Sequence, residues 1–270
     1  LKDDKEISLN SVFLMYWSYC KPIIPSVFIG FIVVFAERWM LQFWGGSVQQ
    51  ALFSVADQFA VVVLLAATAI LRILWKEFSD IFAKRDFEKL KNLYFRSSRL
   101  IFFSCGLMAG FCIPWTEDFI LIILGNDYIQ GVTPLMIMFI YPAFQSMGQL
   151  NGALLLATSK TKIYAFISIT EMLIGLTLAY MLLAPTDAFL PGLSLGATGL
   201  AIKFVIAVLI LSILHIFYIN KIFKWDLNYN FLFYIPIITV ILGFESKVFV
   251  NYLFDYGPFV NDPRTSLIYL

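Results

Sequence analysis

Charged residues are scarce in this chain of 270 residues. Asp, Glu, Lys and Arg together make up 14% of it, whereas they make up about 25% of an ordinary soluble domain. Hydrophobic residues make up 60%, and the mean hydropathy is +0.83. This composition excludes an ordinary soluble domain, and it leaves no role in binding nucleic acid.

Histidine and cysteine are also scarce, and a nucleotide-binding motif is absent from the sequence. The chain has one histidine, His215, and three cysteines, Cys20, Cys105 and Cys112, which all lie in apolar stretches. An odd number of such thiols predicts neither a disulfide framework nor a zinc site. The sequence contains no P-loop and no cluster of metal ligands, and one histidine does not make a nucleophile–base pair. We therefore expect no cofactor or metal, and a protein that is not an enzyme.

The chain is instead rich in apolar stretches long enough to cross a bilayer. About 20 helical residues match a hydrocarbon core of roughly 30 Å, and the stretches lack the alternation of barrel strands. They predict an all-α, polytopic transmembrane bundle (12–254) of about seven spans. These lie near 12–35, 51–71, 99–115, 135–157, 163–184, 196–219 and 231–254. Pro22 and Pro25 predict a kink in the first span. The loop 72–98 is expected to hold two short amphipathic surface helices, with Asp86 capping the second.

Basic residues are segregated between alternate loops. One set of loops holds fourteen Lys and Arg residues and the other set holds two, Arg38 and Arg264. The rich loops are 1–11, 72–99, 158–162 and 220–230, and the poor ones are 36–50, 116–134, 185–195 and 255–270. The positive-inside rule places the rich set, including segment 1–11, in the cytoplasm and the tail 255–270 outside. Because the chain starts at Leu1 in a charged segment and stops as a new apolar run begins, we expect a fragment of a larger protein.

Ionisable side chains inside a span are costly, so each is a candidate functional residue. Helical rise places Asp57 and Lys203 roughly 9 and 11 Å from the outer face. Either the two form a buried ion pair, or Lys203 lines a water-filled cavity and attracts an anionic substrate. Glu171, roughly 12 Å deep, either pairs with Lys203 or carries a coupling proton.

Further polar residues are candidates for a substrate path. Glu37 and Arg38 form a charged pair at the outer end of the first span. Gln145 and Gln149 share a helix face and either bridge helices or hydrogen-bond sugar hydroxyls. His215 lies near the cytoplasmic end of its span and is expected to be a snorkelling polar tip. Glycine pairs four residues apart predict close helix packing, at 106 and 110, 148 and 152, and 192 and 196.

Several short segments, in their order along the chain, resemble a known family of transporters. Glu37-Arg38-Trp39-Met40-Leu41 ends the first span, with Gly45 shortly after; the family more often has Asp where this chain has Glu37. Segments 124–128, 131–135, 157–161 and 195–201 resemble the family's outer segment, its Thr–Lys turn and a later helix start. Together they resemble the Wzx-type oligosaccharide flippases of polysaccharide biosynthesis, within the multidrug/oligosaccharidyl-lipid/polysaccharide (MOP) exporter superfamily.

The resemblance implies a two-lobed transporter in the bacterial inner membrane, with this chain as the second lobe and an N-terminal lobe as its partner. It implies that a lipid-linked oligosaccharide of the undecaprenyl-diphosphate type moves from the cytoplasmic to the outer leaflet among membrane lipids. A cavity cation would offset part of the desolvation cost of the diphosphate. Lys203 and Arg38 are the candidates for that role.

Other functions remain open from the sequence. A Na⁺- or H⁺-coupled drug or metabolite exporter of the same superfamily would use a membrane acid, for which Asp57 and Glu171 are available. A membrane polysaccharide polymerase would show a large basic outer loop, whereas the outer loops here are short and acidic. An O-acyltransferase would need His215. A scaffold without transport activity would tolerate neutralisation of Asp57, Glu171 and Lys203 together.

Overall fold

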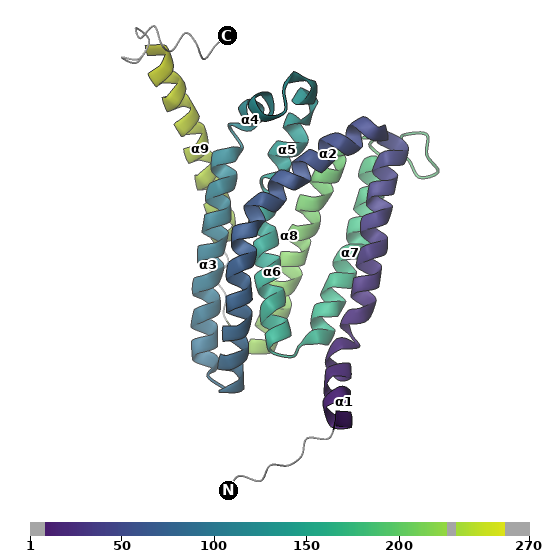
Figure 1. The fold of residues 1–270 in the computed structure, drawn as a ribbon, viewed down its shortest axis with the longest axis vertical. Helices are drawn as coiled ribbons and strands as arrows, with labels where there is room; N and C mark the ends of the chain where they lie inside the picture. Colours follow the sequence, from purple (N-terminus) through teal and green to yellow (C-terminus); the bar gives the residue numbers. More distant parts are fainter. Residues whose placement is uncertain (1–8, 226–230, 257–270) are drawn as a thin grey trace.

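The computed structural model describes residues 9–225 and 231–256, and over these residues it contains helices and no strands (Figure 1). The predictions that fall on residues 1–8 and 257–270, which include Lys2, Lys5 and Arg264, lie outside the described residues. The helices are α1 (Leu9–Cys20), α2 (Ile23–Ala83), α3 (Phe87–Cys112), α4 (Thr116–Ile123), the 3-10 helix η1 (Asn126–Gly131), α5 (Val132–Met138), α6 (Tyr141–Ala157), α7 (Thr161–Leu183), α8 (Gly196–Phe223) and α9 (Phe231–Tyr256). The predicted all-α membrane helix bundle is confirmed.

Four described helical stretches are long and apolar enough to cross a membrane, or five if α3 and α4, bent by 70°, make one span. They are Ile23–Leu65, Thr161–Leu183, Gly196–Phe223 and Tyr234–Leu253. Hydropathy predicted seven spans, and the difference has two physical sources. Helix α2 contains most of two expected spans, joined by a kink rather than by a loop, and α6, with 17 residues, is short. The division into seven spans stays a prediction.

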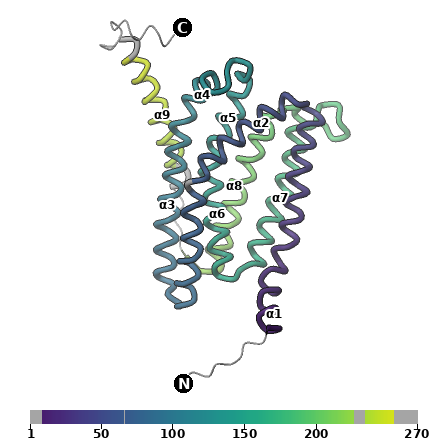
Figure 2. The backbone as a smooth tube through the Cα atoms, in the orientation of Figure 1, coloured from purple at the N-terminus to yellow at the C-terminus, as the bar shows by residue number. Residues whose placement is uncertain are grey.

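Helix α2 folds back on itself at Gly46. Its 61 residues would extend roughly 90 Å if straight, about three times the hydrocarbon thickness. Gly46 has φ 75° and ψ −177°, a backbone conformation that only glycine adopts readily. Figure 2 shows the tube rising, bending over and descending, so α2 has a first arm (23–45) and a second arm (47–83). The predicted kink near the start of the chain is a break between α1 and α2, where Pro22 precedes the first residue of α2.

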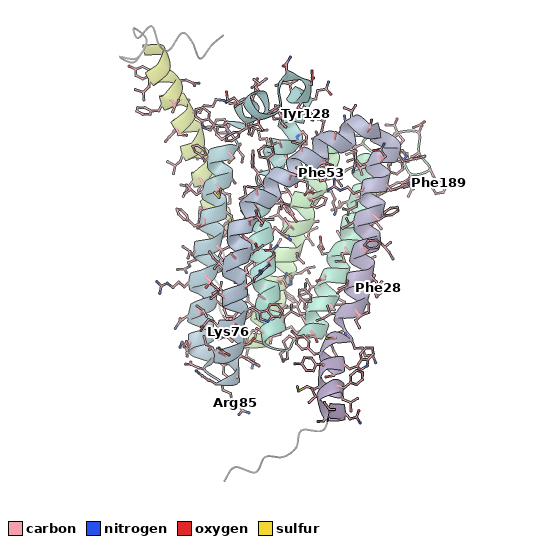
Figure 3. The ribbon with its side chains drawn as sticks, in the orientation of Figure 1. Phe28, Phe53, Lys76, Arg85, Tyr128 and Phe189 are labelled. Carbon is pink, nitrogen blue, oxygen red and sulfur yellow. The ribbon has the colours of Figure 1, made fainter. Side chains whose placement is uncertain are left out.

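The described parts of the loops rich in Lys and Arg lie at one end of the bundle. The α2–α3 turn, the α6–α7 turn and the end of α8 are together at the lower end of Figure 1. The α2 bend, α4, η1 and the α7–α8 loop are at the upper end, and Figure 3 shows Arg85 and Phe189 at these opposite ends. We name these the basic end and the opposite end. The arrangement agrees with the alternation of charge along the sequence.

The basic loop differs from the expected pair of short surface helices. Residues 72–83 continue α2 and residues 87–98 begin α3, so the two helices form one long hairpin. Asp86 accepts a hydrogen bond from the Lys89 backbone N–H at 3.0 Å, which confirms the predicted cap. The physical reason for the difference is burial: Phe78, Leu90 and Tyr94 lie in a protein core with α6 and α8 rather than against lipid.

Helix α9 packs against α3 through residues without side chains. A Cβ atom at Gly110 would collide with the backbone of Thr239, and one at Gly243 would collide with the carbonyl oxygen of Gly110. Gly148 and Gly152 lie similarly close to Leu211 of α8 and Tyr164 of α7. These contacts confirm close helix packing at two of the predicted glycine pairs.

Candidate functional site

A cavity of about 540 Å³ lies between both arms of α2 and helices α6, α7 and α8. Each helix contributes one face, because its lining residues recur three or four apart. On the first arm these are Gly30, Val33, Val34 and Glu37, and on the second arm they are Thr68, Leu71, Arg72 and Trp75. The volume falls within the range of small-molecule sites, about 300–1,000 Å³.

The polar lining contains most of the residues that the sequence singled out. The cavity is lined by five of these candidates, namely Lys203, Gln145, Gln149, Glu171 and Glu37. Arg38 and Asp57 are not among the lining residues. Further polar residues that the sequence did not place in a cavity also line it, among them Arg72 and His215.

Lys203 forms a buried ion pair with Glu37. The two side chains are 7% and 3% exposed, so the pair is almost fully removed from solvent. Lys203 reaches from α8 to the first arm of α2 past Gly175 of α7, where a Cβ atom would lie 2.9 Å from Lys203 Cε. Its ammonium nitrogen also lies 4.4 Å from the centre of the Phe204 ring. The pair therefore joins α8 and α2 in contact with α7.

Arg38 and Asp57 form a second ion pair, across the two arms of α2. Arg38 Nη2 lies 2.7 Å from Asp57 Oδ2, and the guanidinium stands 4.6 Å over the Phe53 ring. The sequence-based pairing of Asp57 with Lys203 is thus wrong. Successive helical residues point about 100° apart, so Glu37 faces the cavity while its neighbour Arg38 faces the second arm. The Arg38 side chain is paired with Asp57 and does not line the cavity.

Glu171 is the acid on the α7 wall of the cavity. It lies one turn before Gly175, the residue that Lys203 passes, yet the lysine pairs with Glu37 instead. Among the described residues Glu171 takes part in none of the three salt bridges. The Glu171–Lys203 pair that the sequence offered as an alternative does not form, because Lys203 pairs with Glu37.

Arg72 is a cavity residue that the sequence reasoning placed in a loop. Because α2 continues to Ala83, Arg72 lies inside the helix, with Thr68 one turn before it and Trp75 one turn after. The spacing of these three residues is the signal that could have revealed a shared face. Within residues 9–225 and 231–256, Arg72 belongs to no salt bridge.

His215 is buried in the cavity wall and is 1% exposed. The expected snorkelling tip is wrong because α8 runs to Phe223, beyond the predicted end of the span, so the ring remains inside the bundle. The Tyr164 ring lies 6.5 Å from it between ring centres. Apart from the Leu211 carbonyl of its own helix, His215 has no hydrogen-bond partner among the described residues.

The comparisons with solved structures find the same arrangement of helices in transporters. The chain is similar to an outward-facing multidrug resistance MATE family transporter of the MOP superfamily, with 16% identity and a TM-score of 0.67 over 83% of this chain and 49% of the other. It is also similar to a MOP superfamily transporter from Pyrococcus furiosus, with 14% identity and a TM-score of 0.61 over 78% and 47%. A third similar structure is a MATE protein in the straight conformation, with 15% identity and a TM-score of 0.60 over 76% of this chain and 46% of the other.

These similarities define the fold. The chain is a multi-pass membrane protein with the helical fold of MOP-type transporters, and it spans about half the length of the solved structures it matches. Neither protein-family models nor curated proteins match the sequence.

Proposed function

We propose that this chain forms one lobe of a transporter in the bacterial inner membrane. The transporter moves a lipid-linked oligosaccharide of the undecaprenyl-diphosphate type from the cytoplasmic to the outer leaflet for surface polysaccharide biosynthesis. The observation that carries the proposal is the cavity, which is lined by an arginine, two glutamines and a histidine and lies inside a MOP-type helix bundle. A cavity of this polarity suits a sugar headgroup, which cannot cross a hydrocarbon core unaided.

The charge distribution favours Arg72 as the residue that contacts the diphosphate. The charge of Lys203 is offset by Glu37, and that of Arg38 by Asp57. Arg72 is exposed and enters no salt bridge in the part of the chain that the structure describes, so its guanidinium is available to a ligand. Guanidinium and phosphate form charge-assisted, frequently bidentate hydrogen bonds. The role first assigned to Lys203 and Arg38 therefore passes to Arg72.

The transport step requires a second lobe. In transporters built from repeats, one half rocks against the other around a site near the middle of the membrane. The present chain matches about half the length of the similar transporters. We propose that an N-terminal lobe packs beside it and closes the substrate path.

A drug or metabolite exporter coupled to Na⁺ or H⁺ is the second candidate. It is favoured by Glu37 and Glu171 in the cavity, and by the multidrug transporter among the similar structures. An acid that binds a coupling ion must be free to do so; Glu37 is occupied by Lys203, so Glu171 is the acid that this function would use. An acyltransferase is disfavoured, because His215 has no acid or hydroxyl hydrogen-bond partner among the described residues.

The test is complementation of a flippase-deficient bacterial strain with the complete gene product. Wild type, Arg72→Ala and Lys203→Ala are compared with Lys76→Ala, one turn further along the same helix and outside the cavity lining. Wild type and Lys76→Ala are expected to restore surface polysaccharide, and Arg72→Ala is expected to reduce it about tenfold or more. If wild type restores no polysaccharide from any repeat unit tested while present in the membrane, the flippase proposal is wrong and drug export is measured next.

A further inference from the structure

The cavity has two ends of different chemistry. The Glu37–Lys203 ion pair lies toward the opposite end, and His215 lies 12 residues further along α8, ~18 Å away by helical rise. The half near the basic end is lined by Arg72, Trp75, Gln149, Tyr164 and His215, among apolar neighbours. This region therefore carries one cation and several hydrogen-bonding groups, and the acid Glu171 lies seven residues beyond Tyr164 on α7, ~10 Å by helical rise.

Two side chains at this end have unused hydrogen-bonding capacity. The Gln149 Oε1 atom is buried without a partner, and His215 has no partner among the described residues besides the Leu211 carbonyl of its own helix. Buried polar groups in proteins are nearly always hydrogen-bonded. A cavity wall that contains such groups is therefore incomplete until a ligand group or water supplies partners. Both residues line the cavity, so the partner comes from the cavity side.

An aromatic ring and two glycines lie beside these groups in the cavity wall. Gly148 and Gly152 flank Gln149 on α6, and the Tyr164 ring lies so close to Gly152 that a Cβ atom there would stand 2.9 Å from ring carbon Cε2. The tyrosine ring is thus packed against helix backbone and held in place. An aromatic face beside neutral hydrogen-bonding groups matches a sugar ring, which has apolar C–H faces and hydroxyls around its edge.

We propose that Gln149, His215 and the ring of Tyr164 form a subsite for a sugar ring, next to the phosphate contact of Arg72. The inference rests on the proposed function and deepens it: the subsite recognises the sugar that is linked to the lipid diphosphate. Gln149 and His215 hydrogen-bond ring hydroxyls, and Tyr164 packs against the face of the ring. The three residues determine which sugar is accepted, whereas Arg72 acts on the phosphate whatever the sugar.

The experiment uses the complete gene product and the repeat unit that wild type exports in the complementation strain. Gln149→Leu and His215→Leu remove hydrogen bonding at similar volume, and His215→Gln restores a neutral polar group. Gln50→Leu is the matched control, because Gln50 also has an unpartnered buried oxygen but does not line the cavity. Export in cells is measured together with binding of the free, phosphate-free oligosaccharide to protein in nanodiscs by saturation-transfer NMR.

Wild type, Gln50→Leu and His215→Gln are expected to bind the phosphate-free oligosaccharide. Gln149→Leu and His215→Leu are expected to bind it about two- to tenfold more weakly, the effect of one lost hydrogen bond. Arg72→Ala is expected to retain this binding while losing export. If wild type exports the repeat unit and both leucine variants bind and export as wild type does, the sugar subsite is refuted and the flippase function stands. Failure of wild type to export any repeat unit removes both proposals.

Discussion

Lys203 is positioned by the absence of a side chain on a third helix. Its ammonium group reaches Glu37 past Gly175, and a methyl group at that position would press against Lys203 Cε. Each charge of such a pair neutralises the other, because either charge alone in a nearly dry site would destabilise the fold. Glu37 and Lys203 therefore belong to one structural unit that links α2 to α8.

A double-mutant cycle tests that unit. Lys203→Met leaves Glu37 buried without a counter-charge and is expected to lower the free energy of unfolding by about 3–5 kcal/mol. Glu37→Gln combined with Lys203→Met is expected to recover most of this loss. Thermal and denaturant unfolding in detergent measure both. Arg38→Met serves as the comparison, because its pair with Asp57 is 29% and 28% exposed and is expected to contribute only about 1 kcal/mol. Equal losses in the single and double variants would contradict the paired role.

The sequence identified most of the polar residues of the cavity but paired them wrongly. Depth along a helix axis follows directly from residue number, and it placed Asp57 and Lys203 together. Ion pairing also depends on the direction in which each helix face points, and that depends on how α2 folds back at Gly46. Hydropathy carries no information about this bend. The partners of Lys203 and Arg38 were therefore beyond sequence reasoning.

At the scale of helices, α3 and α9 meet where two glycines cross. Gly110 and Gly243 let the two backbones touch, and Lys247 of α9 adds hydrogen bonds to the Pro114 carbonyl oxygen at 2.8 Å and to Asp118 Oδ2 at 2.6 Å. In lipid, close packing of this kind replaces the hydrophobic driving force that operates in water. The contact of α9 with the bundle thus depends on the small size of these residues.

Gly243→Leu is expected to separate α9 from α3. A Cβ atom at Gly243 already meets backbone that cannot move aside, whereas one at Gly106 meets the Ile235 side chain at 3.1 Å. A disulfide engineered between the two helices near this crossing is expected to form readily in the Gly106→Ala control and poorly in Gly243→Leu. Cross-linking by mild oxidation and a gel shift measure the difference. Unchanged cross-linking in Gly243→Leu would show that another contact holds α9.

Helix continuity is the element-scale feature that hydropathy missed. The charged residues between Arg72 and Arg99 interrupt the apolar pattern, so the sequence predicted a loop with surface helices. The structure continues both helices through this segment, because Phe78, Leu90 and Tyr94 are buried in the core beside Trp225. The spacing of these residues was visible, but whether their face meets lipid or protein depends on α6 and α8.

For the whole molecule, the segregation of charge between loops is the strongest sequence signal. The basic loops of the described chain lie at one end of the bundle and the α7–α8 loop lies at the other (Figure 3). Loop composition predicted this arrangement because the positive-inside rule depends on where Lys and Arg lie along the chain and not on helix packing. Orientation in the cell follows from the same rule and remains a prediction.

Cysteine labelling tests the orientation. In a variant without its native cysteines, Phe189→Cys lies at a position that is 98% exposed, and Lys84→Cys lies next to Arg85 at the basic end. A membrane-impermeant maleimide is expected to label Phe189→Cys in intact spheroplasts and to label Lys84→Cys only after lysis. The reverse pattern would place the basic end outside and contradict the predicted topology.

The fold-back of α2 has a consequence for biogenesis. The two arms are joined by a kink at Gly46 rather than by an external loop, and Arg38 of one arm neutralises Asp57 of the other. The second arm alone would carry the charge of Asp57 into lipid without a counter-charge. We therefore expect the two arms to leave the translocon together, as one helical hairpin whose charges are already matched.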